Sequence, residues 1–134
     1  MPDEISSEAD LSPERRQENK KLQLRGLRIA NEIEKQLIKV FAEESFRILL
    51  PGGHKWGISR VVSNLEISKV MVYYSVQDVG KTCAELKALA ETLEEKLNGN
   101  IKLFRFQIAQ RVYLKRVPLI EFEWDREFDL AAQV

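Results

Sequence analysis

The chain is poor in the residues from which metal sites, disulfides and membrane spans are built. Among its 134 residues there is one cysteine, Cys83, and one histidine, His54. A single cysteine excludes an intramolecular disulfide, and these two side chains are too few soft ligands for a zinc site. No stretch approaches the run of about 18 apolar residues that a membrane span needs. We therefore expect a protein of a reducing compartment, with no metal, no cofactor and no membrane partner.

The N-terminus also lacks the signals that direct a chain out of the cytoplasm. It does not have the basic and then apolar order of a secretory signal. Asp3, Glu4, Glu8 and Asp10 argue against a mitochondrial transit peptide, which is poor in acids. By elimination, we expect a cytoplasmic location.

The length and the 44% hydrophobic content predict one domain of ordinary size. Residues 1–21 are polar and cannot bury enough surface to offset the entropy of ordering, so we predict a flexible N-terminal tail. The domain then spans residues 22–130, and residues 131–134 form a short C-terminal tail. One alternative stays open for the first segment, because Ser12, Pro13 and Glu14 can begin a helix with Pro13 at its first position.

Hydrophobic periodicity predicts three helices and three strands. Residues 25–46 have apolar side chains at helical spacing, and residues 58–65 and 69–76 are strand-like and closely linked, which predicts a hairpin. Residues 83–97 and 101–115 predict two more helices. Beyond Pro118, apolar and acidic residues alternate in a last strand. The order is α-β-β-α-α-β, which predicts an α+β fold.

The same periodicity predicts which side chains are buried. The second strand places four residues on one face: Val70, Val72, Tyr74 and Val76. The apolar stripe of the second helix begins with Cys83, which we expect to be a small buried side chain. The third helix buries Ile101, Phe104, Ile108 and Val112. Between these two helices stand Asn98, Gly99 and Asn100, residue types that tolerate positive φ, so we predict that the chain turns there.

Charge is unevenly distributed, although 21 basic residues balance 21 acidic ones. Residues 98–118 contain five basic side chains and no acidic one: Lys102, Arg105, Arg111, Lys115 and Arg116. Residues 119–134 have the opposite character, with Glu121, Glu123, Asp125, Glu127 and Asp129 against Arg126 alone. This contrast indicates one surface that meets a polyanion and another that avoids it.

The third predicted helix is the candidate binding surface. On a helical wheel one flank, away from the core stripe, collects Lys102, Arg105, Phe106, Ala109, Tyr113 and Arg116. Cations meet phosphates and release counterions, while aromatic rings stack on unpaired bases, so this pattern favours RNA. Arg25 and Arg28, at the start of the first helix, extend the positive surface. The alternative is an ordinary solvated face, although such faces usually mix both signs.

The sequence contains no convergent catalytic motif. Gly80, Lys81 and Thr82 resemble the end of a phosphate-binding loop, but Ser75 stands where that motif needs a glycine, so we assign the triplet to the start of the second helix. We do not expect His54 and Cys83 to form a catalytic pair, and the paired acids lie on predicted solvated faces. We therefore expect neither an enzyme nor a small-molecule substrate.

Three blocks of sequence, in order, resemble the bacterial ribosome-binding factor A family. The first is Arg25-x-x-Arg28-Ile29-Ala30-x-Glu32-Ile33, and the second is Asn64-Leu65-x-x-Ser68-Lys69-Val70-x-Val72-Tyr73. The third is Arg116-Val117-Pro118-Leu119-x-x-Phe122-x-x-Asp125. Together they cover about residues 25–128. The acidic N-terminal extension is not part of the family's common pattern.

The resemblance implies a type II KH-like single domain, with a three-stranded sheet packed on one side by helices. It implies a non-enzymatic factor for ribosome biogenesis, which binds the small ribosomal subunit and its rRNA during maturation and rRNA processing. In that family a kink with Ala-x-Gly replaces the usual loop between two helices. Here the kink falls near residues 100–102 by its separation from Pro118, whereas the available glycine is Gly99, so Asn98, Gly99 and Asn100 are our candidate kink.

A protein interaction module is the alternative function. The same α/β layer would then pair with a partner or with a second copy, the basic face meeting the acidic side formed by Glu121, Glu123 and Asp125. We expect a monomer, which a mass measurement in solution distinguishes from that alternative.

Overall fold

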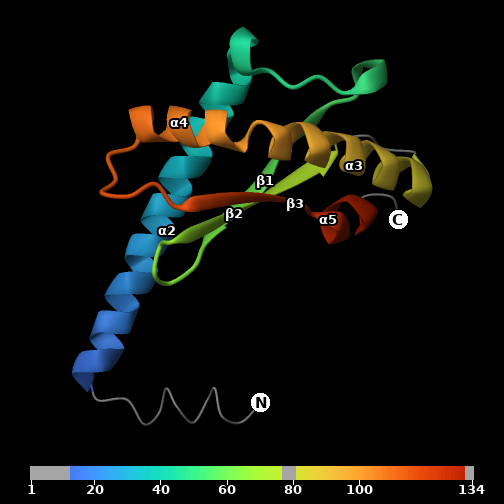
Figure 1. Ribbon diagram of the computed structural model, residues 1–134. Helices are drawn as coiled ribbons and strands as arrows, with labels where there is room; N and C mark the ends of the chain where they lie inside the picture. Colours follow the sequence, from blue (N-terminus) through green and yellow to red (C-terminus); the bar gives the residue numbers. More distant parts are fainter. Residues whose placement is uncertain (1–12, 77–80, 132–134) are drawn as a thin grey trace.

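The structure is a computed structural model that describes residues 13–76 and 81–131. Its main elements are α2 (Pro13–Ala42), β1 (Trp56–Ser63), β2 (Lys69–Val76), α3 (Cys83–Gly99), α4 (Ile101–Arg111), β3 (Leu119–Trp124) and α5 (Arg126–Ala131). Two short 3₁₀ turns, Glu44–Phe46 and Pro51–Gly53, connect α2 to β1. The predicted order of helices and strands is confirmed, and α5 is an addition to it (Figure 1).

The sheet has three strands, with β2 at its centre. β1 pairs with β2 in antiparallel register, as the predicted hairpin requires, whereas β3 pairs with β2 in parallel. Two parallel strands run in the same direction, so a crossover must return the chain to the end of the sheet at which the first strand began. α3, α4 and residues 112–118 make this crossover, and it ends where the Leu119 N–H donates to the Ser68 carbonyl at 2.9 Å.

The turn between β1 and β2 is closed by the side chain of Asn64. Its Oδ1 accepts hydrogen bonds from the N–H groups of Ser68 at 2.9 Å and Lys69 at 3.1 Å, and its Nδ2 donates to Ser68 Oγ. Hydrogen bonds from an asparagine side chain to nearby backbone groups stabilise a tight turn. Ile67 adopts a left-handed φ of 57°, which is rare for a β-branched residue and which the Asn64 bonds help to maintain.

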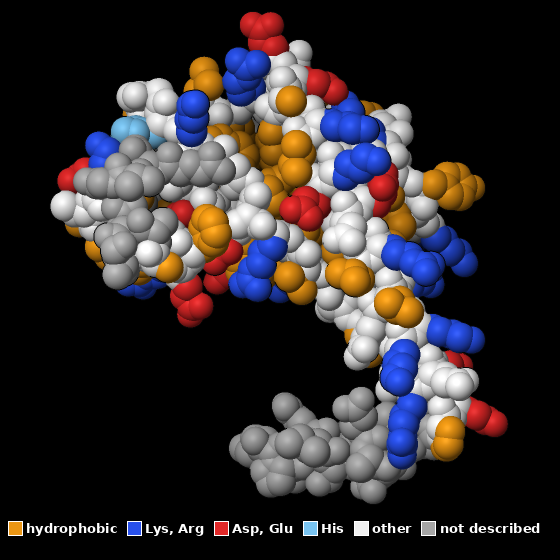
Figure 2. Space-filling view, turned by 180° about the vertical axis from the view of Figure 1, so that it is seen from behind, with side chains coloured by type: hydrophobic (Ala, Val, Ile, Leu, Met, Phe, Trp, Pro, Cys, Tyr) orange, Lys and Arg blue, Asp and Glu red, His pale blue; other side chains and the backbone are white. Residues whose placement is uncertain are grey.

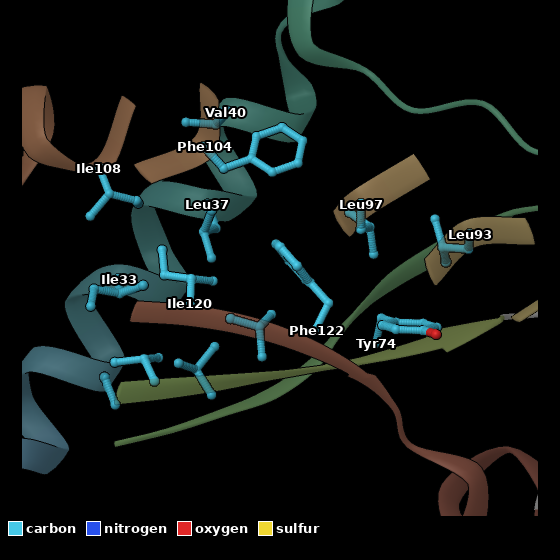
Figure 3. Close-up of a cluster of buried hydrophobic side chains, with 14 of the residues drawn as sticks. Ile33, Leu37, Val40, Tyr74, Leu93, Leu97, Phe104, Ile108, Ile120 and Phe122 are labelled. Atoms are coloured by element: carbon cyan, nitrogen blue, oxygen red, sulfur yellow. The ribbon is translucent and has the colours of Figure 1, made fainter. Parts of the chain in front are cut away.

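All three long helices pack against one face of the sheet, which confirms the expected layering (Figure 1). The four predicted inward side chains of β2 are at most 2% exposed. They meet residues from α2, α3, α4 and β3: Ile33, Leu37, Val40, Leu93, Leu97, Phe104, Ile108, Ile120 and Phe122 (Figure 3). The Tyr74 hydroxyl donates to the Ala90 carbonyl of α3 at 3.1 Å, and burial raises the pKa of this phenol, so it remains a donor.

Three sequence-based expectations are wrong. Residues 13–21 are helical instead of forming an irregular tail, so the alternative start at Pro13 is the one found, while residues 1–12 lie outside the described residues. Cys83 is exposed because Thr82 caps α3 and the first turn projects beyond the core, so burial begins at Leu86. The third predicted helix ends at Arg111, four residues earlier than expected.

A buried carboxylate completes the sheet beyond the end of β3. The Asp125 N–H donates to the Tyr74 carbonyl, but β3 has ended before it can offer an acceptor to the Val76 N–H of β2. Asp129 of α5 supplies that acceptor, since its Oδ2 receives the Val76 N–H at 2.8 Å and the Trp124 indole N–H at 2.5 Å. Asp129 is only 3% exposed, so this carboxylate accepts its hydrogen bonds inside the protein, away from solvent.

Replacing Asp129 by alanine should therefore lower the free energy of unfolding by about 2–4 kcal/mol, because two buried donors lose their acceptor. Chemical denaturation followed by circular dichroism measures the change. Glu127→Ala, an exposed acid on the same helix, is the matched control and should change stability by less than about 0.5 kcal/mol. Equal stabilities of the two variants would show that Asp129 does not fasten α5 to the sheet.

Candidate nucleic-acid interface

The helix break in the crossover falls on a single residue, Asn100. Its backbone leaves the helical region at φ −119° and ψ 17°, its N–H donates to the Leu97 carbonyl at 3.1 Å, and its Nδ2 donates to the Lys96 carbonyl at 2.8 Å. The predicted turn at residues 98–100 is therefore present, although Gly99 does not adopt the positive φ that a glycine tolerates. One residue near the bridge region is enough to redirect the chain from α3 into α4.

The exposed side of α4 begins with an unpaired cation. Lys102 is exposed, the first turn of α4 contains no acidic residue, and no described carboxylate lies within 4 Å of the Lys102 ammonium. One turn later Phe106 is 59% exposed. This side of α4 therefore presents a positive charge and an aromatic ring together, as the sequence predicted.

Arg105 is turned away from solvent and holds the following loop. Its Nη2 donates to the Val117 carbonyl at 3.1 Å and its Nε donates to the Pro118 carbonyl at 3.3 Å. The side chain is half-buried. These contacts fix the point where the chain enters β3, so we assign Arg105 to positioning the loop instead of to direct phosphate contact.

Arg111 is neutralised within the protein. Its Nη2 lies 2.5 Å from Oε1 of Glu43, at the end of α2, and its side chain is only 26% exposed. A cation already paired in this way gives up little further energy to a phosphate, because the glutamate must first be displaced. The expectation that all five cations of residues 98–118 face outward is therefore wrong for Arg105 and Arg111.

The remaining cations of this segment lie on the loop of residues 112–118. α4 ends because Val112 becomes extended, at φ −117° and ψ 125°, and buries its side chain in the core. The helical wheel consequently fails for Tyr113 and Arg116, which are not on the helix. Tyr113 is fully exposed, and Lys115 and Arg116 are exposed with no described carboxylate within 4 Å.

α2 contributes a second group of cations. Arg25 and Arg28 are exposed, and no described carboxylate lies within 4 Å of either guanidinium. The helix continues toward its N-terminus through Lys20 and Lys21, also exposed, which sequence reasoning missed because it placed them in a tail. Figure 2 shows basic side chains gathered along this projecting part of α2 and on the adjoining side of the molecule.

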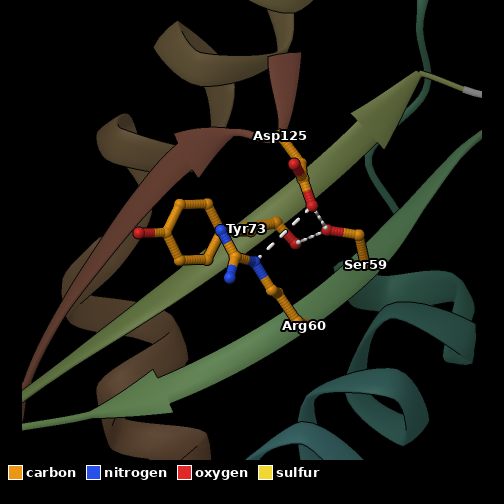
Figure 4. Close-up of polar contacts among 4 residues, drawn as sticks. All are labelled: Ser59, Arg60, Tyr73 and Asp125. Carbon is orange, nitrogen blue, oxygen red and sulfur yellow. Dashed lines mark hydrogen bonds and ion pairs between the residues drawn. The ribbon is translucent and has the colours of Figure 1, made fainter. Parts of the chain in front are cut away.

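The uncovered face of the sheet has different electrostatics. Arg60 lies over the Tyr73 ring at 4.1 Å and 3.7 Å from Asp125, while Asp125 also accepts a 2.6 Å hydrogen bond from Ser59 (Figure 4). Lys69 pairs with Glu121 at 3.1 Å. The acidic side proposed for the alternative function is thus largely paired within the fold.

A hollow of 590 Å³ lies between the C-terminal end of α2 and the start of β1. Its walls are mainly apolar, and its rim includes Arg47, His54 and Lys55 but no acidic residue (Figure 2). Trp56 lines it with the indole N–H fixed on the Ile48 carbonyl at 2.9 Å. His54 lines this hollow, whereas Cys83, on the first turn of α3, does not.

The described part of the chain holds neither a metal centre nor a membrane-spanning helix. Residues 13–76 and 81–131 contain no group of three histidine, cysteine, aspartate or glutamate side chains placed to hold a metal ion. In the same ranges no helix combines the length and the apolar character that crossing a bilayer requires.

Comparison with known structures shows the same fold in two proteins. A solution NMR structure from Thermotoga maritima, of a candidate ribosome binding factor A, is 26% identical, with a TM-score of 0.57 over 74% of this chain and 85% of that one. The crystal structure of ribosome-binding factor A from Thermus thermophilus is 18% identical, with a TM-score of 0.50 over 75% of this chain and 91% of that one. No curated protein sequence matches.

The family comparison agrees with these structures. The model for ribosome-binding factor A matches residues 25–134. This range includes the whole sheet, the α3–α4 crossover and the loop of residues 112–118, which we call the cationic loop. The N-terminal part of α2, before Arg25, lies outside the match. The chain therefore belongs to the ribosome-binding factor A family.

Proposed function

We propose that this protein is a non-enzymatic assembly factor that binds the small ribosomal subunit and its rRNA during maturation. Its family supports a ribosome-binding role. The small subunit as the partner, the rRNA contact and the absence of catalysis are our proposal. The observation that carries it is the set of exposed cations without a described carboxylate within 4 Å: Lys102, Lys115, Arg116, Arg25 and Arg28.

Recognition in this proposal depends on RNA shape and backbone more than on base identity. Lysine and arginine contacts to phosphates set affinity and carry no sequence information directly. Phe106 and Tyr113 provide exposed rings beside these cations, and such rings stack on bases that are not paired. A single-stranded or bulged rRNA segment close to a duplex suits both groups of side chains.

Arg105 and Arg111 act indirectly in this proposal. Arg105 holds residues 117 and 118, and thereby places Lys115 and Arg116 beside α4. Arg111 ties the end of α4 to the end of α2 through Glu43. Both arginines therefore shape the surface that the other cations present.

Replacing Lys115 and Arg116 together by alanine should weaken binding to small subunits and reduce its dependence on salt. Two lost phosphate contacts lower the slope of log K against log salt concentration by roughly 1.4–1.8. Co-sedimentation with small subunits over a salt series measures both quantities. Lys87→Ala with Arg126→Ala removes the same charge from exposed positions elsewhere and should leave the slope nearly unchanged.

The same slope for both double variants would mean that net charge, and not this loop, determines binding. Binding of the wild-type protein to free large subunits alone would contradict the choice of subunit.

Tyr113→Ala should weaken binding by about tenfold, since stacking of one base on an aromatic ring contributes about 1–3 kcal/mol. The salt slope should not change, because no phosphate contact is lost. Tyr113→Phe keeps the ring and should bind like the wild type. If the alanine and phenylalanine variants lose the same affinity, the hydroxyl group of Tyr113 and not the stacking of its ring contributes to binding.

A further inference from the structure

A second, smaller groove lies beside the part of α2 that precedes the family match. It has a volume of 370 Å³ and runs between α2 and the end of the β1–β2 hairpin. α2 and the hairpin approach each other at Gly26, where a Cβ would be in ordinary van der Waals contact with the Asn64 carbonyl oxygen at 3.7 Å. Four apolar side chains that line the groove remain 39–57% exposed: Leu22, Leu27, Val62 and Leu65.

The helix surface around this groove is strongly positive. Residues 13–28 contain six basic side chains and two acidic ones, Glu14 and Glu18. Four of the basic residues are exposed along the stretch that lines or adjoins the groove: Lys20, Lys21, Arg25 and Arg28. An occupant of this groove therefore needs apolar side chains together with negative charge.

Residues 1–12, which lie outside the described residues, have that composition. They contain four acidic residues, Asp3, Glu4, Glu8 and Asp10, and no lysine or arginine. They also contain Ile5, an apolar side chain placed among the acids. This segment is joined to the first residue of α2 and is absent from the region that the family model matches.

The segment is long enough to reach the groove. α2 rises about 1.5 Å per residue, so Leu22 lies about 14 Å and Leu27 about 21 Å along the helix from Pro13. The eight residues from Ile5 to Pro13 span up to about 27 Å when extended. Ile5 can therefore lie at either position, with Glu8 and Asp10 beside the first turns of α2.

We propose that residues 1–12 fold back along α2, with Ile5 in the groove and the side chains of Asp3 and Glu4 over the cations from Lys20 to Arg28. The docked segment occupies the same charges that RNA phosphates would contact, so the two compete. The competition rests on the proposed function, whereas the docking does not. Because docking is intramolecular, even weak ion pairs suffice to populate it.

Docking is tested by NMR on the full-length protein. Ile5→Ser should shift the amide resonances of residues 22–27 and 62–65, since the apolar contact is lost. Asp3→Asn with Glu4→Gln should shift the same resonances by removing two charges. Glu91→Gln with Glu95→Gln, two exposed acids on α3, is the matched control and should leave them in place.

Competition is tested by the affinity for small-subunit rRNA at low salt. The Asp3→Asn, Glu4→Gln variant should bind about fivefold more tightly than the wild type, and the α3 control should bind like the wild type. The gain should disappear at high salt, where exposed charges are screened.

Unchanged groove resonances in Ile5→Ser would overturn the docking. If the groove resonances depend on protein concentration and sedimentation shows a dimer, the occupant of the groove is a second copy of the chain and not residues 1–12. Shifted resonances with equal rRNA affinity would overturn the competition alone, and absence of rRNA binding in every variant would overturn the proposed function while leaving the docking in place.

Discussion

The parallel pairing of β3 with β2 is the constraint on which the rest of the structure depends. It obliges the chain to leave the sheet after Val76, cross one face and return beside Lys69, at the opposite end of the central strand. α3 and α4 make this crossover on the same face of the sheet as α2. The cationic loop is the last part of the crossover, so its position follows from where β3 must begin.

This arrangement separates the molecule into two sides with different electrostatics. The outer side of the crossover and α2 present cations without described carboxylates within 4 Å. The uncovered face of the sheet holds two acids in internal contacts, since Asp125 is engaged with Ser59 and Glu121 with Lys69. A polyanion is therefore attracted to one side of a chain whose net charge is zero.

The sequence was informative where one periodicity decided the structure. The alternation of Val70, Val72 and Tyr74 correctly predicted strand, face and burial, because side chains of a strand point to opposite faces in turn. Contacts between distant residues could not be predicted in this way. Arg111 and Glu43 are 68 positions apart, and only the packing of α4 on α2 brings them together. The helical wheel likewise assumed that the helix continues past Val112. The helix ends at Arg111 instead, because Val112 turns into the core.

Directed hydroxyl-radical probing tests the central claim most directly. An iron chelate is tethered to a single cysteine, introduced as Lys115→Cys or as Glu123→Cys in a Cys83→Ser background, and the protein is bound to small subunits. The cationic side should face the rRNA, so position 115 should cleave it at defined sites and position 123, on the uncovered sheet face, should cleave little. Strong cleavage from position 123 with none from position 115 would contradict the account.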